Sequence, residues 1–205
     1  MTAKKKTYAR VARLYDLLDL PFEYGRYRPL RKELWQGAEG TILDAGVGTG
    51  RNIDFYPEGS RVTGIDLSPS MLARAMDRDL RKGSKAEVVV LNEVNVMETP
   101  FPDDTFDCVI SSFLFCVLDD EHQLAALKEL ARVTKPGGEI RILEYAYSRR
   151  WFKRLIMRLW APWVKMMYGA AFDRETEQYA EAAGLTLVED RFLFDDIIKM
   201  LVLKV

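Results

Sequence analysis

Cysteine and histidine are scarce in this chain. Its 205 residues include two cysteines and one histidine, His122. Cys108 and Cys116 lie in an apolar stretch without CxxC spacing, so we expect two buried, reduced thiols and neither a disulfide framework nor a metal site. We expect His122 to face solvent at the start of a helix rather than to act as a base.

Long apolar runs and a strong net charge are also missing. No run approaches the roughly 20 apolar residues that a membrane-spanning helix needs, and the first residues, MTAKKKTYARVARLYD, lack the hydrophobic segment of a secretory signal. The net charge of -1 does not by itself suggest a polyanionic partner. With 48% hydrophobic and 30% charged residues, we expect one domain over residues 1–205, located in the cytoplasm.

Short runs rich in valine and isoleucine alternate with helical stretches. The apolar periodicity from Leu124 to Ala131 predicts a helix that ends at the KPGG sequence of residues 135–138. Alternation of this kind is typical of an α/β domain with a mostly parallel sheet. The strands expected in this sheet cover residues 41–45, 61–66, 87–91, 107–112 and 139–145.

Two segments fall outside this alternation. Residues 1–36 contain a helical stretch with a break at Pro21 and Phe22, which we interpret as an N-terminal helical lid. Residues 148–169 fit no strand and predict one or two helices, interrupted near Pro162 and inserted after the fifth strand. Beyond them we expect a helix over residues 174–183 and an antiparallel pair of strands over residues 185–192 and 197–205.

A glycine-rich turn follows the first expected strand. Residues 44–50 read DAGVGTG, and Asp66 ends the next expected strand twenty positions after Gly46. Glycines at this place permit a tight turn and close approach of a ligand, and an acid after the second strand can accept hydrogen bonds from both ribose hydroxyls. The combination predicts a site for an adenosine-bearing ligand. Asp66 also fits a second role as the N-cap of the next helix.

Spacing and charge discriminate between two such ligands. Dinucleotide sites usually contain G-x-G-x-x-G, which places a helix N-terminus on a pyrophosphate. Here the pattern is G-x-G-x-G, and Asp44 precedes it by two residues, where a carboxylate would repel a pyrophosphate. S-adenosylmethionine has no phosphate and carries a sulfonium and an ammonium group. We therefore predict S-adenosylmethionine as the cofactor.

Four motifs resemble those of class I S-adenosylmethionine-dependent methyltransferases: LDAGVGTG, GIDLSPSML, FPDDTFDCVISSF and LKELARVTKPGGEIRI, in this order across residues 43–142. The resemblance implies a Rossmann-like fold with a mostly parallel seven-stranded sheet and helices on both faces. It implies that the acid and glycines of the first motif hold the methionine part of the cofactor, and that the acid of the second holds the ribose. The implied cofactor residues are Asp44, Gly46, Gly48 and Asp66, with Leu67 and Met71 beside the adenine and Ser111 and Ser112 beneath the methionine part.

The chain departs from this family just before the FPDD sequence. Family members often have an aspartate there that meets the adenine amino group, whereas this chain has Asn95, Val96 and Met97. The carbonyl oxygen of Asn95 can replace the carboxylate, so we assign these three residues to the cofactor site. The alternative is that Asn95 only shapes a turn.

Positive charge is concentrated at two places. Residues 1–36 have nine cationic and four acidic side chains, and residues 149–168 have six cationic side chains and no acid. A helical projection of the second segment separates a basic side from an aromatic side. The basic side holds Arg150, Lys153, Arg154 and Arg158, and the aromatic side holds Trp151, Phe152, Leu155, Leu159 and Trp163.

This pattern predicts peripheral binding to an anionic membrane surface, at the inner face of the cytoplasmic membrane. Basic residues attract anionic headgroups, and tryptophan favours the boundary between headgroups and acyl chains. A core face and a dimer seam are the alternatives. No RNA-binding module is recognisable, so we expect no nucleic-acid partner, and the oligomeric state stays open, with a monomer among the options.

Tyrosines accompany both basic segments. Tyr15, Tyr24 and Tyr27 lie in the expected lid, and Tyr145 and Tyr147 lie at the end of the fifth expected strand. Tyrosine faces stabilise a quaternary ammonium, and their hydroxyls can bind an amine or a phosphate. With the motif block and the basic aromatic insertion, these features resemble the soluble bacterial phospholipid N-methyltransferases, which are similar to ubiquinone/menaquinone C-methyltransferases. The resemblance implies phosphatidylethanolamine as the acceptor and phosphatidylcholine as the product.

We hypothesise an in-line methyl transfer to the uncharged amine, driven by alignment and desolvation. Its predicted residues are Tyr15, Tyr24 and Tyr27 to orient the amine, Arg26, Arg28 or Arg149 to hold the substrate phosphate, and Glu144 as a candidate proton acceptor. Tyr15 as a packing residue and Glu144 as solvated scaffold are the alternatives. Two other functions stay open: C-methylation of a quinone precursor, and a non-catalytic membrane-bound partner protein.

Overall fold

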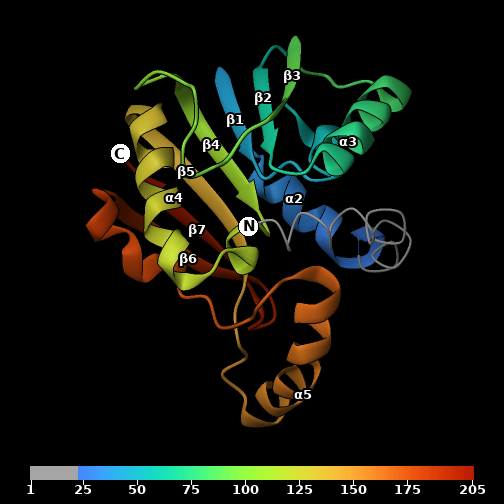
Figure 1. Cartoon of the computed structure of the whole chain (residues 1–205), viewed down its shortest axis with the longest axis vertical. Helices are drawn as coiled ribbons and strands as arrows, with labels where there is room; N and C mark the ends of the chain where they lie inside the picture. The colour runs from blue at the N-terminus through green and yellow to red at the C-terminus, as the bar shows by residue number, and fades with distance from the viewer. Residues whose placement is uncertain (1–22) are drawn as a thin grey trace.

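The computed structural model describes residues 23–205 and contains a seven-stranded sheet in the order β3-β2-β1-β4-β5-β7-β6 (Figure 1). β7 runs antiparallel to both of its neighbours, and the other adjacent strands are parallel. The expected mostly parallel sheet, completed by an antiparallel pair, is therefore confirmed. The strands are β1 Thr41–Ala45, β2 Arg61–Asp66, β3 Val88–Glu93, β4 Phe106–Ser112, β5 Thr134–Tyr145, β6 Thr186–Phe194 and β7 Ile198–Lys204.

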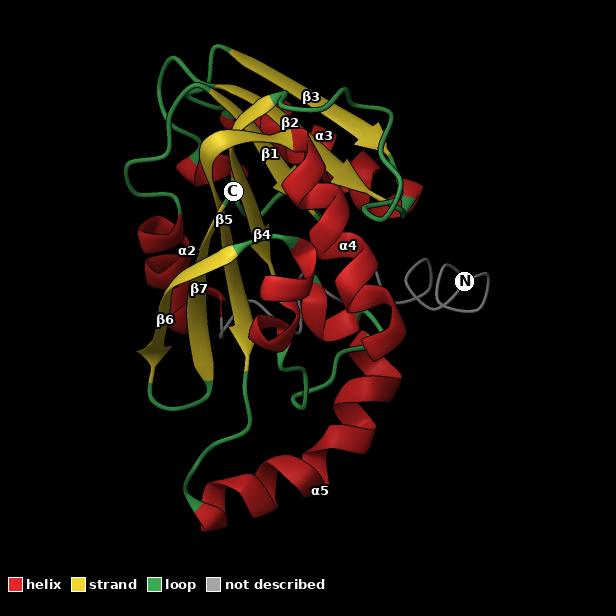
Figure 2. Cartoon of the chain, turned by 90° about the vertical axis from the view of Figure 1, so that its left-hand side faces the viewer, coloured by secondary structure: helices red, strands yellow, loops and turns green. Residues whose placement is uncertain are grey.

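Helices cover both faces of the sheet (Figures 1 and 2). Successive strand residues point to opposite faces, so the buried neighbours Ile42 and Leu43 of β1 join two different apolar clusters. The cluster of Leu43 includes residues of α4, and that of Ile42 includes residues of α2 and α3. The helices are η1 Glu23–Tyr27, α2 Arg28–Leu34, η2 Ile53–Phe55, α3 Pro69–Lys82, η3 Phe115–Val117, α4 Asp120–Val133, α5 Trp151–Tyr168, η4 Thr176–Tyr179 and η5 Glu181–Ala183.

The expected insertion is the helix α5, which lies beyond the carboxyl ends of the parallel strands (Figure 1). Its start is fixed by the Asp196 carboxylate, which accepts hydrogen bonds from the Ser148 hydroxyl at 2.7 Å and the Arg149 N–H at 2.8 Å. The helix continues through Pro162 instead of breaking there. A proline cannot donate a backbone hydrogen bond to the carbonyl four residues before it, which here is that of Arg158. Pro162 and Arg158 are both exposed, so water can bind this carbonyl instead.

No helix among residues 23–205 has the length and apolar character needed to cross a membrane.

The predicted α-helix over residues 174–183 is wrong, because this segment forms the two short 3-10 helices η4 and η5. The Thr176 hydroxyl donates a hydrogen bond to Gln123 Oε1 of α4 at 2.8 Å, which fixes the start of η4 by a tertiary contact. Gly184, in the left-handed conformation, then ends η5 and turns the chain into β6. Tertiary hydrogen bonds here override the local helical preference.

β5 begins at Thr134 rather than at the expected residue 139, because residues just after α4 already pair with β4 across a bulge. Gly138 permits this close pairing. A Cβ atom on Gly138 would lie 2.7 Å from Thr134 Cγ2 and 2.9 Å from the Asp107 carbonyl oxygen. The glycine is therefore required by the approach of two backbones rather than by the end of a helix.

Replacing Gly138 by alanine should lower the free energy of unfolding by about 1–3 kcal/mol, because the added methyl group overpacks this junction. Urea unfolding followed by circular dichroism measures the change. The neighbouring Gly137→Asn is the control, since that position has a φ of 79° and no atom within 4 Å of where a Cβ would lie, and asparagine tolerates this conformation. Equal stability of Gly138→Ala and the natural protein would contradict the packing argument.

Candidate functional site

Asp44 is completely buried near the carboxyl end of β1. Its Oδ2 accepts a hydrogen bond from the Tyr56 hydroxyl at 2.7 Å, and its Oδ1 accepts one from Asn52 Nδ2 at 2.9 Å. Burial raises the pKa of Asp44 to about 6, although these hydrogen bonds and the positive charge of Arg31 oppose the shift. A buried carboxylate of this kind is stabilised by a ligand that brings positive charge.

Arg31 of α2 is inserted next to this carboxylate and is itself buried. Its Nη1 donates hydrogen bonds to Ser112 Oγ at 2.7 Å and to Asn52 Oδ1 at 2.8 Å, and its guanidinium carbon lies 5.4 Å from the centre of the Phe113 ring. α2 is thereby connected to the end of β4 through Ser112 and to the end of β1 through Asn52, which binds Asp44. The sequence placed Arg31 only among the lid cations, and its position between Leu30 and Leu34 on a buried helix face was the available signal.

Asp66 joins the glycine turn to the loop after β2. Its Oδ2 accepts the N–H of Gly48 at 3.0 Å, and its Oδ1 accepts the N–H of Ser68 at 2.8 Å. Burial raises the pKa of Asp66, and the two backbone hydrogen bonds oppose the increase. The turn itself depends on Gly50, whose φ is 77° and where an added Cβ would lie 2.9 Å from Ala75 Cα of α3. Gly46 N–H closes the turn onto the Ile65 carbonyl at 2.9 Å.

Other predicted cofactor residues near this turn differ in their burial and in their hydrogen bonds. Leu67 is half-buried and Met71 is buried at the start of α3. Ser111 pairs with Ala45 across β1 and β4, and its buried hydroxyl has no hydrogen-bond partner within residues 23–205. A buried hydroxyl without a partner at this edge is what a polar ligand would satisfy.

Asn95 shapes a turn, which was the alternative to a role in binding the adenine. Asn95 Oδ1 accepts the N–H of Met97 at 3.2 Å, so the carbonyl oxygen predicted to meet the adenine also shapes its own turn. Val96 is buried in the core, and Met97 packs against the same apolar cluster. The assignment of these three residues to the adenine stays a prediction.

Five aromatic side chains form a continuous row, which runs from η1 past the end of β4 and β5 to the segments on either side of α5. We call Tyr27, Phe113, Tyr145, Phe172 and Tyr147 the aromatic row. Neighbouring ring centres are 5.3 Å apart for Tyr27 and Phe113, 4.7 Å for Phe113 and Tyr145, 5.5 Å for Tyr145 and Phe172, and 5.9 Å for Phe172 and Tyr147.

The first part of this row contains a hydrogen bond and a strained residue. The hydroxyls of Tyr27 and Tyr145 are 3.0 Å apart. Phe113 has a φ of 57°, a conformation that aromatic residues rarely adopt and that clusters at functional sites. Of the predicted amine-orienting tyrosines, Tyr27 belongs to the row. Tyr15 lies outside the residues that the structure describes. For Tyr24, the structure describes the backbone, in η1, but not the side chain.

Glu144 is buried beside η3 rather than exposed as solvated scaffold. Its two carboxylate oxygens accept the N–H groups of Phe115 and Cys116, each at 2.9 Å. Burial raises the pKa of Glu144 to about 8, and these hydrogen bonds oppose the shift. Glu144 therefore positions η3, and its predicted role as proton acceptor stays a prediction. The expected burial of the cysteines is confirmed, since Cys108 and Cys116 are both buried and free.

The three arginines predicted to bind the substrate phosphate are not brought to one point. The Arg26 and Arg149 guanidinium groups lie over Phe194 and Phe192 of β6, at 5.2 and 5.5 Å from the ring centres. Arg28 instead forms an ion pair with Asp54 at 2.6 Å and lies over Phe55. Arg28 thus has its charge partly neutralised within the protein.

Comparison with known proteins adds family membership to this geometry. A family described as a methyltransferase domain matches residues 42–138. A demethylmenaquinone methyltransferase of Tropheryma whipplei is 30% identical over 208 residues, which cover 96% of this chain and 80% of that protein. The chain is an S-adenosylmethionine-dependent methyltransferase. Its cofactor is therefore S-adenosylmethionine, as the charge of the turn predicted.

Other similarities are narrower or structural. A phosphatidylethanolamine N-methyltransferase of Cereibacter sphaeroides is 39% identical over 106 residues, so the match spans about half of each protein. A methyltransferase of Aquifex aeolicus has a TM-score of 0.66 at 22% identity, covering 96% of this chain and 97% of its own. A geranyl diphosphate C-methyltransferase of Streptomyces coelicolor, solved with S-adenosylhomocysteine, has a TM-score of 0.68 at 17% identity, covering 87% and 81%. These structures show that the fold is shared.

The buried groups of this methyltransferase fit such a cofactor. Asp44 would supply negative charge for the ammonium and sulfonium, and Arg31 is a candidate partner for the cofactor carboxylate. The Ser111 hydroxyl, which has no partner within residues 23–205, would offer a further hydrogen bond. The sequence did not predict Asn52 and Tyr56, because neither residue belongs to one of the four motifs.

The affinity of the methyltransferase for S-adenosylhomocysteine should weaken as the pH falls below about 6, by up to tenfold per pH unit. The cofactor favours the ionised carboxylate, so protonation of Asp44, whose pKa is about 6 before binding, competes with binding. Calorimetric titrations from pH 5 to pH 8 measure this dependence.

Two variants serve as controls for this pH dependence. Asp44→Asn should bind weakly and lose the Asp44 contribution, although Asp66 still titrates. Arg31→Gln should move the midpoint to higher pH, because the Arg31 charge lowers the pKa of Asp44. A natural protein with constant affinity across this range would refute the role of Asp44.

Proposed function

We propose that this methyltransferase methylates the headgroup amine of phosphatidylethanolamine and of its mono- and dimethyl derivatives, giving phosphatidylcholine at the inner surface of the cytoplasmic membrane. The observation that carries this proposal is the aromatic row. Its Phe113 ring lies against the buried Arg31, and the hydroxyls of Tyr27 and Tyr145 are within hydrogen-bond distance of each other. Ring faces favour the cationic methylammonium products, and tyrosine oxygens accept hydrogen bonds from an amine. The partial similarity to a phosphatidylethanolamine N-methyltransferase supports the same acceptor.

The proposed reaction needs little covalent chemistry from the protein. The cofactor supplies an electrophilic methyl group on a sulfonium. The uncharged amine would form the new C–N bond as the S–C bond breaks, so the positive charge would move from sulfur to nitrogen. After the first and second transfers the product ammonium would lose a proton to water, whereas the third transfer gives a quaternary ammonium that keeps its charge. Tyr27 and Tyr145 would orient the amine, and the apolar faces of Phe113 and Phe172 would exclude water from it.

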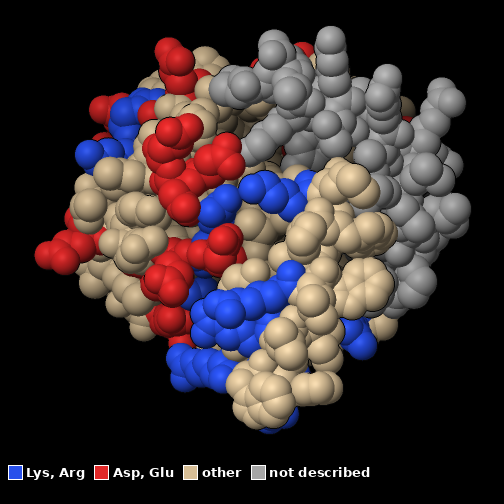
Figure 3. Space-filling view, turned by 60° about the horizontal axis from the view of Figure 1, so that its bottom comes forward, with Lys and Arg blue, Asp and Glu red and all other residues tan. Residues whose placement is uncertain are grey.

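The outer face of α5 supports action at a membrane surface. Trp151 is 78% exposed, Leu159 73% and Met166 65%, so this face is not a core face within residues 23–205. α5 contains no acid, and lysine and arginine side chains lie beside its apolar ridge (Figure 3). Exposed tryptophans next to basic side chains match the chemistry of anionic lipid headgroups over acyl chains.

A second function has support from the extent of sequence similarity. The demethylmenaquinone methyltransferase relative matches over 96% of this chain, which favours C-methylation of a quinone precursor. That reaction requires a base to remove the ring proton. Glu144, the candidate base, has both oxygens bonded to the backbone of η3, which favours the amine acceptor instead.

Incubation with labelled S-adenosylmethionine and vesicles of phosphatidylethanolamine and phosphatidylglycerol should label the lipid headgroup, as measured by mass spectrometry. Tyr27→Leu and Tyr145→Leu should each lower this rate about 2- to 30-fold, because a cation–π contact contributes roughly 0.5–2 kcal/mol. Tyr179→Leu, on η4 and outside the row, is the control for a general loss of an aromatic ring. Labelling of an added demethylmenaquinol with no headgroup labelling would replace the proposal by its alternative.

Replacing Leu159 by serine should weaken binding to the same vesicles about tenfold or more, because burial of a leucine side chain contributes roughly 1.5–3 kcal/mol. Vesicle sedimentation measures the affinity. Leu80→Ser is the matched control, since Leu80 is 85% exposed but lies on α3, away from α5. If Leu159→Ser leaves vesicle binding intact and instead abolishes self-association in sedimentation velocity, the face is a dimer seam.

A further inference from the structure

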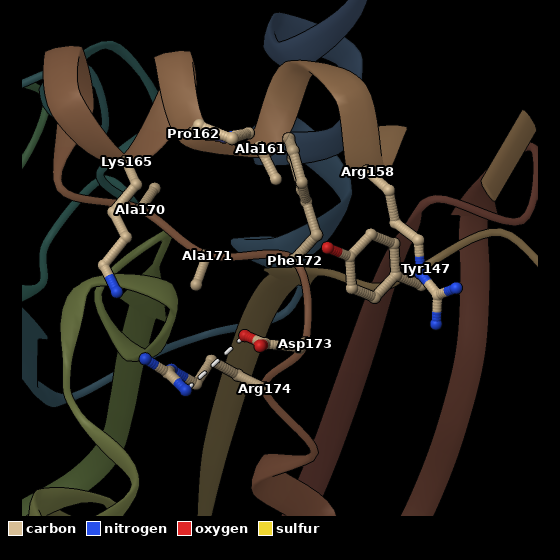
Figure 4. Close-up of a pocket in the computed structure, with 10 residues that line it drawn as sticks. All are labelled: Tyr147, Arg158, Ala161, Pro162, Lys165, Ala170, Ala171, Phe172, Asp173 and Arg174. Atoms are coloured by element: carbon tan, nitrogen blue, oxygen red, sulfur yellow. Dashed lines mark ion pairs between the residues drawn. The ribbon is translucent and has the colours of Figure 1, made fainter. Parts of the chain in front are cut away.

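A cavity of about 370 Å³ lies between α5 and residues 170–174 (Figure 4). Arg158, Ala161, Pro162 and Lys165 form its α5 side, and Phe172 and Tyr147 stand opposite or beside them. Its lining combines apolar side chains with the charged residues Arg158, Lys165, Asp173 and Arg174, so it can admit a ligand that has a charged group. Arg158, Pro162 and Lys165 are themselves exposed, so the cavity is open to solvent.

Two cations of this cavity, Arg158 and Lys165, have no ion-pair partner within residues 23–205. Lys165 extends from α5 toward Arg174, and Arg158 extends past the ring of Tyr147 (Figure 4). They are seven residues apart, so their backbones are roughly 10 Å apart along the helix, and both side chains are long enough to reach a ligand between them. Their uncompensated charges favour an anionic ligand.

The third cation of the cavity has a different role. Arg174 lies 3.0 Å from Asp120, 3.5 Å from Asp173 and 3.8 Å from Asp119. These ion pairs hold the 170–174 segment against the start of α4, and three carboxylates surround the one guanidinium, so Arg174 contributes no excess positive charge to the cavity. The anion-binding capacity of the cavity therefore rests on Arg158 and Lys165.

The cavity is continuous with the aromatic row. Phe172 lines the cavity, and its ring centre lies 5.5 Å from that of Tyr145. The Ala171 N–H donates to the Cys116 carbonyl at 2.8 Å, which fixes this wall to η3, and Glu144 holds η3 in turn. A ligand with an amine at Tyr145 and an anionic group a few bonds away would therefore extend past Phe172 into the cavity.

We propose that this cavity binds the phosphodiester of the acceptor lipid, with Arg158 and Lys165 as its counter-ions. The inference rests on the proposed amine acceptor and assigns the phosphate to α5 rather than to Arg26, Arg28 or Arg149. It gives α5 two functions, because its exposed apolar side chains would contact the membrane while Arg158 and Lys165 would bind the headgroup. Arginine and lysine are both suited to a phosphate oxygen, the first through paired N–H groups and the second as a compact charge.

The direct test measures binding of sn-glycero-3-phosphoethanolamine, which has the headgroup without acyl chains, to the full chain saturated with S-adenosylhomocysteine. The Arg158→Gln/Lys165→Gln variant should bind this probe at least tenfold more weakly, with unchanged affinity for S-adenosylhomocysteine. Arg150→Gln removes a positive charge from the N-cap of the same helix, outside the cavity, and should bind the probe normally. Equal binding by the double variant and the natural protein would overturn the assignment.

Binding of inorganic phosphate distinguishes a site for the lipid headgroup from a site for free phosphate. It should bind at least tenfold more weakly than the glycerol ester, because it lacks the amine that the aromatic row would bind. Equal affinities would mean a site for free phosphate and would overturn the headgroup assignment.

Kinetics with a dispersed short-chain phosphatidylethanolamine distinguishes failure of this inference from failure of the proposed function. The double variant should raise KM at least tenfold and leave kcat within about twofold. Normal KM in the double variant overturns the phosphate site while the acceptor stands. If the natural protein does not methylate this lipid, the acceptor fails, and binding of the glycerol ester at Arg158 and Lys165 then decides the phosphate site independently.

Discussion

The burial of Asp44 is the constraint on which the rest of this site depends. A carboxylate without water must be surrounded by donors and positive charge, and Asn52, Tyr56 and Arg31 supply them from three parts of the chain. Because Arg31 comes from α2, the same requirement fixes α2 against the ends of β1 and β4. Tyr27, one turn before, is thereby placed where its hydroxyl meets that of Tyr145.

The carboxyl-end edge of the sheet thus has two chemically different regions. The region at Asp44 and Asp66 is acidic and closed, and it suits a cofactor that carries positive charge. The region beyond Phe113 is aromatic, and it leads toward a cavity with basic side chains under α5. The strained backbone of Phe113 lies where the two regions meet, which is where a methyl group would pass between donor and acceptor.

The sequence was most informative where a motif depends on local backbone chemistry. The glycine turn, Asp66 and the first strands could be predicted, because positive φ values and strand periodicity are local properties. Arg31 could not be assigned, because its partner Ser112 lies 81 positions away and no pattern links them. The helix expected over residues 174–183 failed for the same reason, since the Thr176 contact with α4 is tertiary. For α5, amphipathicity predicted a helix with two unlike sides, but it could not place Arg158 and Lys165 at a cavity with residues 170–174, because that contact is tertiary.

The measurement that tests the central claim most directly is the proton release that accompanies cofactor binding at pH 6. Calorimetry of S-adenosylhomocysteine in buffers of different ionisation enthalpy gives this number. About half of the Asp44 carboxyls are protonated at that pH before binding, so roughly half a proton should leave per cofactor. In Asp44→Asn the release should fall to the smaller contribution of Asp66. Binding heats that are the same in every buffer, or a release that is undiminished in Asp44→Asn, would contradict the account.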